Sequence, residues 1–277
     1  MKVLVLTSNA MRHRFIANTL AEVAEEAVVV CECRPSDAAG LAAGSSSVAA
    51  HFRLRYETER AWFAGHDVFR AGTLPVLYGE AHLPSTAQIV KEFRPDLCVV
   101  FGASLIKDPL LSLLPSGRTV NLHLGLSPYY RGSGTNFWPF VNEELEYVGS
   151  TLLHLDAGID TGAIIAHILP EIEQGDTVHT VGCKVIRASA EGLLHVVRLV
   201  REGRTLPHVP QWRVAGGRCY RSKDVTEEVL ARYRHNLEQG LVERFLRGQR
   251  KPVKVIRFLE ADQPLPAAPP NKKVLTP

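Results

Sequence analysis

The chain opens with two short apolar runs separated by an amphipathic stretch, and this order limits the folds open to it. Residues 3–7 and 27–31 are continuously apolar, and residues 11–25 between them carry apolar side chains at helical spacing. A strand, a helix and a second strand in that order are typical of an α/β domain with a parallel sheet. The turn after the first run lacks the glycine pattern of dinucleotide-binding folds, so we expect no nicotinamide or flavin cofactor.

Strands and helices continue to alternate along the chain. We expect helices at residues 48–63, 87–93 and 176–203, the last with Asp176 as N-cap, and a buried strand at 97–101. Further strands are expected at 119–123, 147–155 and 163–169, with loops at 40–47, around Pro75 and at 125–134. After residue 204 the pattern changes to a second long helix at 227–248 and a proline-rich tail at 264–277. We therefore predict a domain at 1–205 and a mainly helical extension at 206–277.

Charge and hydrophobicity exclude several classes of partner. The 277 residues include 32 basic and 29 acidic side chains, a net charge of +3, which gives no reason to expect a nucleic acid or membrane partner. No apolar run approaches the ~18–20 residues of a membrane helix, and the first run is too short for a signal peptide. The odd number of cysteines, five, then favours free thiols in a reducing cytoplasm. Cys31 and Cys33 could hold a metal, but no third ligand lies nearby in the sequence, and we expect none.

Three polar side chains fall where the chain should be least polar. Asn121 and His123 are two residues apart on an expected strand, so both should project to one face of the sheet. Asp160 lies in a glycine-rich turn between two apolar strands. Each feature alone is weak, because strand histidines are often structural and turns attract Asp and Gly. Their order within an α/β frame is much more specific.

Two segments carry a family resemblance. Residues 121–132 read NLHLGLSPYYRG and residues 155–162 read LDAGIDTG. Together they resemble the 10-formyltetrahydrofolate-dependent formyltransferases, which include methionyl-tRNA, glycinamide ribonucleotide and sugar N-formyltransferases. The resemblance covers about residues 1–205 and implies a Rossmann-like catalytic domain with 10-formyltetrahydrofolate as co-substrate. It places the family's catalytic residues at Asn121, His123 and Asp160.

One position departs from the family pattern. The family usually reads His-x-Ser-Leu-Leu-Pro, and here Gly125 stands in place of the serine. The departure removes a hydroxyl contact next to the catalytic strand and leaves the three catalytic positions intact. Ser127 would substitute only if the loop bends differently.

The resemblance also implies where the two substrates bind. The folate pteridine would bond to backbone groups of the turn after the 97–101 strand and of the glycine-rich loop, at Ser104, Leu105, Ile106, Asp156, Gly158 and Ile159. Plain core packing is an equal alternative for Leu105 and Ile106. Tyr129, Tyr130 and Arg131 are candidates on the acceptor side, although a surface arginine is the commoner outcome for Arg131, and Trp138 and Phe140 are expected in the core.

The resulting hypothesis is an enzyme that moves a formyl group from 10-formyltetrahydrofolate to the primary amine of a small molecule, such as an amino sugar nucleotide or a natural-product amine. Methionyl-tRNA is disfavoured, because that enzyme carries a C-terminal β-barrel of which the short extension shows no sign. The alternatives are a formyltetrahydrofolate deformylase, which resembles this chain less because it carries an additional N-terminal regulatory domain, and a non-catalytic folate-binding module. A homodimer is compatible with all three of these functions.

Overall fold

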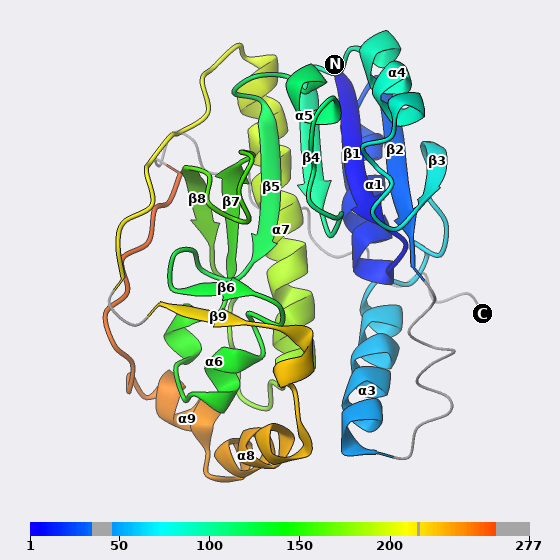
Figure 1. Ribbon diagram of the computed structural model, residues 1–277. Helices are drawn as coiled ribbons and strands as arrows, with labels where there is room; N and C mark the ends of the chain where they lie inside the picture. The colour runs from blue at the N-terminus through cyan, green and yellow to red at the C-terminus, as the bar shows by residue number, and fades with distance from the viewer. Residues whose placement is uncertain (35–45, 215–216, 259–277) are drawn as a thin grey trace, which may run out of the picture.

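The computed structural model describes residues 1–34, 46–214 and 217–258, and it is built around one seven-stranded sheet (Figure 1). The strand order is β3-β2-β1-β4-β5-β7-β8. The first five strands in this order run parallel, whereas β7 pairs antiparallel with both β5 and β8. The strands are β1 (Lys2–Ser8), β2 (Glu26–Cys33), β3 (Gly72–Leu77), β4 (Leu97–Phe101), β5 (Thr119–Leu124), β7 (Ser150–His154) and β8 (Ile164–Ile168). The predicted α/β class is confirmed, with a mixed rather than a purely parallel sheet.

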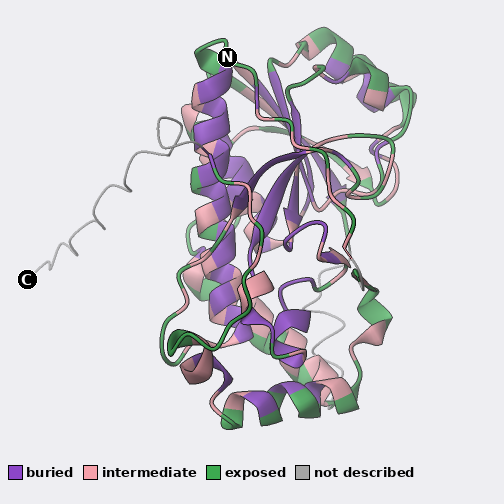
Figure 2. Cartoon of the chain, turned by 90° about the vertical axis from the view of Figure 1, so that its left-hand side faces the viewer, coloured by how far each residue is buried: buried purple, intermediate pink, exposed green. Residues whose placement is uncertain are grey.

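Two layers of helices cover the sheet. On one face, α1 (Met11–Val23) and α7 (Val178–Arg201) pack against inward-facing side chains of β1, β4 and β5. On the opposite face, α4 (Pro84–Phe93) and α5 (Leu110–Leu113) pack against side chains of β1, β2, β3 and β4. The inner strands β1 and β4 are buried between these layers (Figure 2). The half of that second face formed by β5, β7 and β8 is left to loops, and the polar strand residues lie there.

Strand β3 lies where the sequence favours a loop around Pro75. It pairs with β2 alone and forms the edge of the sheet, where a proline without an N–H is tolerated. Its residues alternate between exposed and half-buried, so the run lacks the apolar character that marks β1 and β4. The predicted loop at this position is wrong.

The long central helix begins one residue later than predicted. Thr177, not Asp176, is the N-cap of α7: its hydroxyl accepts from the Thr180 amide, and the Thr180 side chain accepts from the Thr177 amide. The Asp176 carboxylate instead accepts from the Thr180 hydroxyl and pairs with Lys184. The predicted end at Gly203 agrees with its φ of +70°.

The expected helix at 227–248 is two helices, α8 (Glu227–Glu238) and α9 (Leu241–Leu246). The chain turns between them at Gly240, whose φ is +71°. Both helices pack with α6 (Trp138–Val141) in a second apolar cluster that contains Leu230, Tyr233 and Leu241. Trp138 and Phe140 are buried in the same cluster, as expected.

The extension also joins the rest of the chain by backbone pairing. Strand β9 (Arg218–Tyr220) pairs parallel with β6 (Tyr130–Gly132), a short strand inside the segment predicted to be an irregular loop. Short 3₁₀ turns lie at Leu145–Tyr147, labelled η1, and at Ser222–Asp224, labelled η2, and α3 (Ser47–Trp62) lies beside α7 and α8. Most of the expected 40–47 loop and the proline-rich tail lie outside the described residues. The division into units at residue 205 stays a prediction.

Candidate active site

Strand β5 presents the two central polar side chains of the site. Val120 and Leu122 point into the core beneath α7, so Asn121 and His123 project to the opposite face, as the alternation predicts. The Asn121 amide nitrogen donates to Asp160 Oδ1 over 2.9 Å. His123 Nδ1 lies 3.3 Å from Asp160 Oδ2. The structure therefore brings the three predicted catalytic residues together, with the Asp160 carboxylate bridging the other two.

The turn that carries Asp160 is built from its own side chains. Asp156 accepts from the Gly158 amide over 3.1 Å and from the Thr161 hydroxyl over 2.9 Å. A Cβ on Gly158 would lie 1.9 Å from the Thr161 hydroxyl, so only glycine fits there. Asp160 itself has a φ of +53°, a left-handed conformation that Asp and Asn tolerate better than other residues with a side chain. The turn thus holds Asp160 over β5 in a left-handed backbone conformation that other contacts must stabilise.

His123 lies between two hydrogen-bond acceptors. Nδ1 faces the Asp160 carboxylate, and Nε2 lies 3.1 Å from the backbone carbonyl oxygen of Tyr130. Only the doubly protonated ring can donate to both groups at once. The side chain is only 6% exposed, so water competes little for these bonds. Both ring nitrogens of His123 therefore have an acceptor within reach.

Gly125 follows His123 closely in space as well as in sequence. Its φ is +140°, and a Cβ there would lie 2.6 Å from Thr135 Cβ, 2.8 Å from Thr135 Oγ1 and 3.0 Å from His123 Nε2. Thr135 is buried, at 3% exposure. The space that a serine would need is therefore taken by Thr135 and by the histidine ring. Ser127 does not substitute for the serine, because its hydroxyl is buried and has no hydrogen-bond partner among the residues described.

The predicted folate turn after β4 is anchored by a residue that the sequence analysis missed. Glu32, at the end of β2, is fully buried and accepts from the Ser104 amide over 2.7 Å and from the Ser104 hydroxyl over 2.5 Å. It also accepts from the amides of Gly79 and Ala81. The Ser104 amide is thus already used, which leaves the Leu105 and Ile106 backbone groups for the predicted folate contacts.

The apolar side chains around this turn differ in exposure. Leu105 is 41% exposed and Ile159 is 70% exposed, as expected for walls that a flat ligand would cover. Ile106 is 3% exposed and packs in the core with α4 and α5. For the Ile106 side chain the core-packing alternative is therefore favoured, whereas its backbone contact to the folate stays a prediction.

The three acceptor-side candidates lie in different surroundings. The Tyr129 hydroxyl bonds to the backbone of Lys254, and its ring lies against Trp212. The guanidinium of Arg131 donates to Gln211 Oε1 over 3.2 Å. Both side chains therefore contact the extension beyond residue 205.

Tyr130 does not line an acceptor site, and that prediction is wrong. Its ring is 1% exposed in the second apolar cluster, and its hydroxyl donates to Glu144 over 2.6 Å. Burial, with the bond to Glu144, raises the pKa of the Tyr130 phenol. Arg218 of β9 pairs with the same Glu144 carboxylate. Tyr130 contributes to the site through its backbone carbonyl alone.

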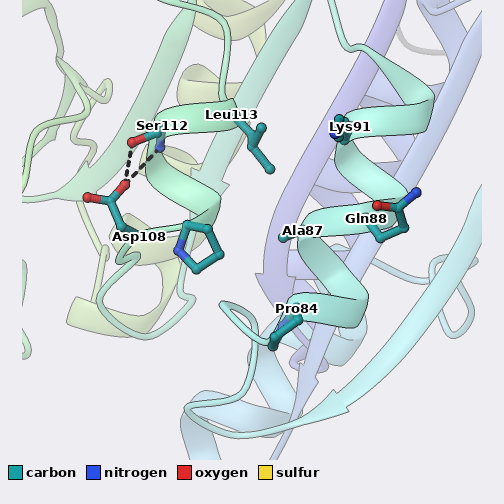
Figure 3. Close-up of a pocket in the computed structure, with 8 residues that line it drawn as sticks. Pro84, Ala87, Gln88, Lys91, Asp108, Ser112 and Leu113 are labelled. Atoms are coloured by element: carbon teal, nitrogen blue, oxygen red, sulfur yellow. Dashed lines mark hydrogen bonds between the residues drawn. The ribbon is translucent and has the colours of Figure 1, made fainter.

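A cavity of about 500 Å³ lies elsewhere, between α4 and α5 (Figure 3). Its lining includes Pro84, Gln88, Lys91 and Leu113, and Asp108 accepts there from the amide and hydroxyl of Ser112. None of the three catalytic candidates lines it. The catalytic candidates are instead recognised by their contacts with one another.

The described residues offer neither a metal site nor a membrane-spanning helix. Within residues 1–34, 46–214 and 217–258, no group of three or more His, Cys, Asp or Glu side chains is placed to hold a metal ion. In the same residues, no helix is both long and apolar enough to cross a membrane.

Comparisons with known proteins identify the family of the chain. A family model described as formyl transferase matches residues 1–197. The methionyl-tRNA formyltransferase of Desulforamulus reducens is 34% identical over 125 residues, which cover 45% of this chain and 38% of that protein. The one from Anaeromyxobacter sp. (strain K) is 33% identical over 157 residues, 56% of this chain and 47% of that protein. The chain thus spans less than half the length of these curated relatives.

Solved structures show the same fold at low identity. A 4-N formyltransferase from Francisella tularensis has a TM-score of 0.54 and 17% identity, covering 84% of this chain and 86% of that one. An N-formyltransferase from Helicobacter canadensis, in complex with folinic acid and dTDP-3-aminofucose, has a TM-score of 0.53 and 16% identity, covering 82% and 73%. Since the family model matches residues 1–197 of 277 and the fold agrees, the chain belongs to the formyl transferase family.

Proposed function

We propose that this chain transfers a formyl group from 10-formyltetrahydrofolate to the primary amine of a small molecule. One observation carries the proposal: the Asp160 carboxylate contacts both Asn121 and His123, which lie on the same face of β5. Family membership supports it, since the three residues stand at the positions where the resemblance places the catalytic groups.

The proposed chemistry uses each of these groups. The amine nitrogen forms a bond to the formyl carbon, and the electron pair of the C=O π bond moves to the oxygen. Asn121 has a second amide hydrogen beyond the one given to Asp160, and it can donate this hydrogen to the oxyanion. His123 Nε2–H can exchange the Tyr130 carbonyl for the same oxyanion, because Asp160 engages Nδ1.

The intermediate then returns its electron pair to the carbon, and the bond from the formyl carbon to the folate N10 breaks. The amine loses one proton and N10 gains one, so the step is balanced without an external acid or base. His123, Asp160 or a water held by them can carry that proton. No covalent enzyme intermediate is required.

The cofactor side of the proposal rests on the turn after β4 and on the Asp160 turn. Backbone groups of Leu105 and Ile106 would bond to the pteridine, and the exposed side chains of Leu105 and Ile159 would cover its faces. Asp156 and Gly158 would act by shaping the second turn, because their contacts are within it. Ser104 would act by anchoring the first turn to Glu32.

For the acceptor, we favour a small-molecule amine such as an amino sugar nucleotide or a natural-product amine. Support comes from the extension: its described residues, 206–214 and 217–258, hold one three-residue strand and two helices rather than the strands of a barrel. Methionyl-tRNA is the second candidate, because the curated relatives quoted above are methionyl-tRNA formyltransferases. A cytoplasmic location and a homodimer stay predictions.

One experiment separates these candidates. The full chain is incubated with 10-formyltetrahydrofolate and, separately, with amino sugar nucleotides, other small amines and methionyl-tRNA, and products are followed by mass spectrometry. We expect one small amine to gain the mass of a formyl group. Formylated methionyl-tRNA would instead establish the second candidate. Formate without any formylated amine would indicate a deformylase, and folate binding without turnover would indicate a binding module.

A further inference from the structure

We propose that Gln211, in the extension beyond the family match, is a positioning residue that holds the Asp160 turn and the His123 side of the site together. The inference rests on the proposed function and adds a residue to it. Gln211 lies fourteen positions after the last residue of the family match, at 197 (211 − 197 = 14). It therefore lies beyond the part of the chain that the family model matches.

The first observation is the pair of bonds made by the Gln211 amide nitrogen. Nε2 donates to the backbone carbonyls of Asp160 and Gly162, each over 2.8 Å. These two carbonyls lie on either side of Thr161, directly after Asp160, whose φ of +53° is left-handed. Both hydrogens of one amide are thus used to hold the turn in the conformation that aims the carboxylate at β5.

The second observation is the opposite end of the same amide. Gln211 Oε1 accepts from Arg131 Nη2 over 3.2 Å. Arg131 lies in β6 directly after Tyr130, whose carbonyl oxygen contacts His123 Nε2. The amide therefore links the turn that carries Asp160 to the strand that contacts the other nitrogen of His123. Its orientation is fixed by chemistry, because a flipped amide would set its oxygen against two carbonyl oxygens.

The third observation is how the backbone of the segment is held. Leu206 is buried in the main core, and the Pro207 carbonyl oxygen lies 2.9 Å from His154 Nε2. Val209 pairs with Ile164 of β8 through two backbone bonds, of 2.8 and 2.9 Å. These attachments fix Gln211 against the turn. Residues 206–211 therefore hold the turn that carries the Asp160 carboxylate in place.

Gln211→Glu tests the inference with almost no change of shape. A carboxylate oxygen would face two carbonyl oxygens and could not donate, so the turn should move. A displacement of about 1 Å at a catalytic group can lower the rate by about 10²-fold. We expect kcat to fall by about 10–100-fold, with a smaller rise in KM for 10-formyltetrahydrofolate, because Ile159 of the same turn would contact the folate. Gln211→Met, which keeps the length without a charge, should fall in the same direction.

Gln249→Glu is the matched control, because it makes the same charge change at an exposed position of the extension. It should keep the parent kcat. Parent values of kcat in both Gln211 variants would overturn the inference. So would a loss of kcat accompanied by an equal rise in KM and a lower melting temperature, since that pattern indicates a structural role.

A second readout separates this inference from the proposed function. Hydrogen exchange of peptides spanning residues 156–162 should be faster in Gln211→Glu than in the parent chain, with exchange elsewhere unchanged. If the parent chain transfers no formyl group to any amine, the proposed function fails, and this measurement still decides the role of Gln211. Unchanged exchange in that turn would then refute it.

Discussion

At the scale of single residues, Asn121 makes the most specific prediction. Its second amide hydrogen is free to meet the oxyanion, so Asn121→Ala should lower kcat by about 10²–10³-fold, or ~2.7–4 kcal/mol. KM for the folate should change little, since the bond matters most in the transition state. Steady-state kinetics and melting temperature on the same sample test this. A variant that is less stable but turns over at the parent rate would contradict it.

At the scale of elements, Glu32 ties β2 to the turn after β4. Glu32→Gln replaces one acceptor oxygen with a donor that faces other donors, so the buried group loses bonds worth about 1–3 kcal/mol. We expect lower stability and a raised KM for 10-formyltetrahydrofolate, with kcat changed less. Urea unfolding and kinetics measure both effects. Glu92→Gln, at an exposed position of α4, is the control, and a Glu32 variant that resembles it would refute the role of the turn.

Two histidines at the contact of α3 and α7 predict a loss of stability in acid. The rings of His51 and His179 lie 4.6 Å apart. Burial, with Arg55 and Arg234 nearby, lowers the pKa of His51 to about 4. Burial, with His51 and Arg55 nearby, lowers the pKa of His179 to about 3.

Because the unfolded chain binds protons at these groups below about pH 6.5 and the folded chain does not, stability should fall as the pH drops from about 6.5 towards 4. His179→Phe should make the difference in unfolding free energy between about pH 7 and pH 5 smaller by about 1–2 kcal/mol. Chemical unfolding at the two pH values measures it, with His235→Phe, at an exposed position of α8, as the control. An unchanged difference in His179→Phe would exclude these rings as the cause.

At the scale of the whole molecule, the extension is part of the folded unit. Leu206 and Phe258 pack in the main core, and α8 and α9 complete the second cluster. A chain ending at Arg204 should therefore expose apolar surface, lose its cooperative melting transition and aggregate. Size-exclusion chromatography and thermal unfolding test this. A monodisperse truncated chain that still transfers formyl groups would contradict both this prediction and the role of Gln211.

Elements that depend on neighbouring residues could be predicted from the sequence, whereas side chains whose partners lie far away in the chain could not. The strands β1 and β4 follow from continuous apolar runs, and the shared face of Asn121 and His123 follows from the alternation of side chains along β5. These predictions are confirmed. Gln211 and Glu32 act on partners 51 and 72 residues away, and nothing in their own neighbourhood marks them. The side chain of Tyr130 was misplaced for the same reason, because β6 pairs with a strand nearly ninety positions later, with Arg218 opposite Tyr130 (218 − 130 = 88).

The close approach of Gly125 to Thr135 has a consequence for how sequences of this kind can diverge. A side chain at position 125 and the threonine at position 135 claim the same space beside the histidine. Positions 125 and 135 are therefore coupled. A serine at position 125 requires a smaller or differently placed side chain at position 135. It also requires a backbone at position 125 that does not have the φ of +140°. Each change alone would be selected against. We therefore expect relatives to carry either glycine at position 125 with threonine at position 135, or serine at position 125 with a smaller or differently placed side chain at position 135.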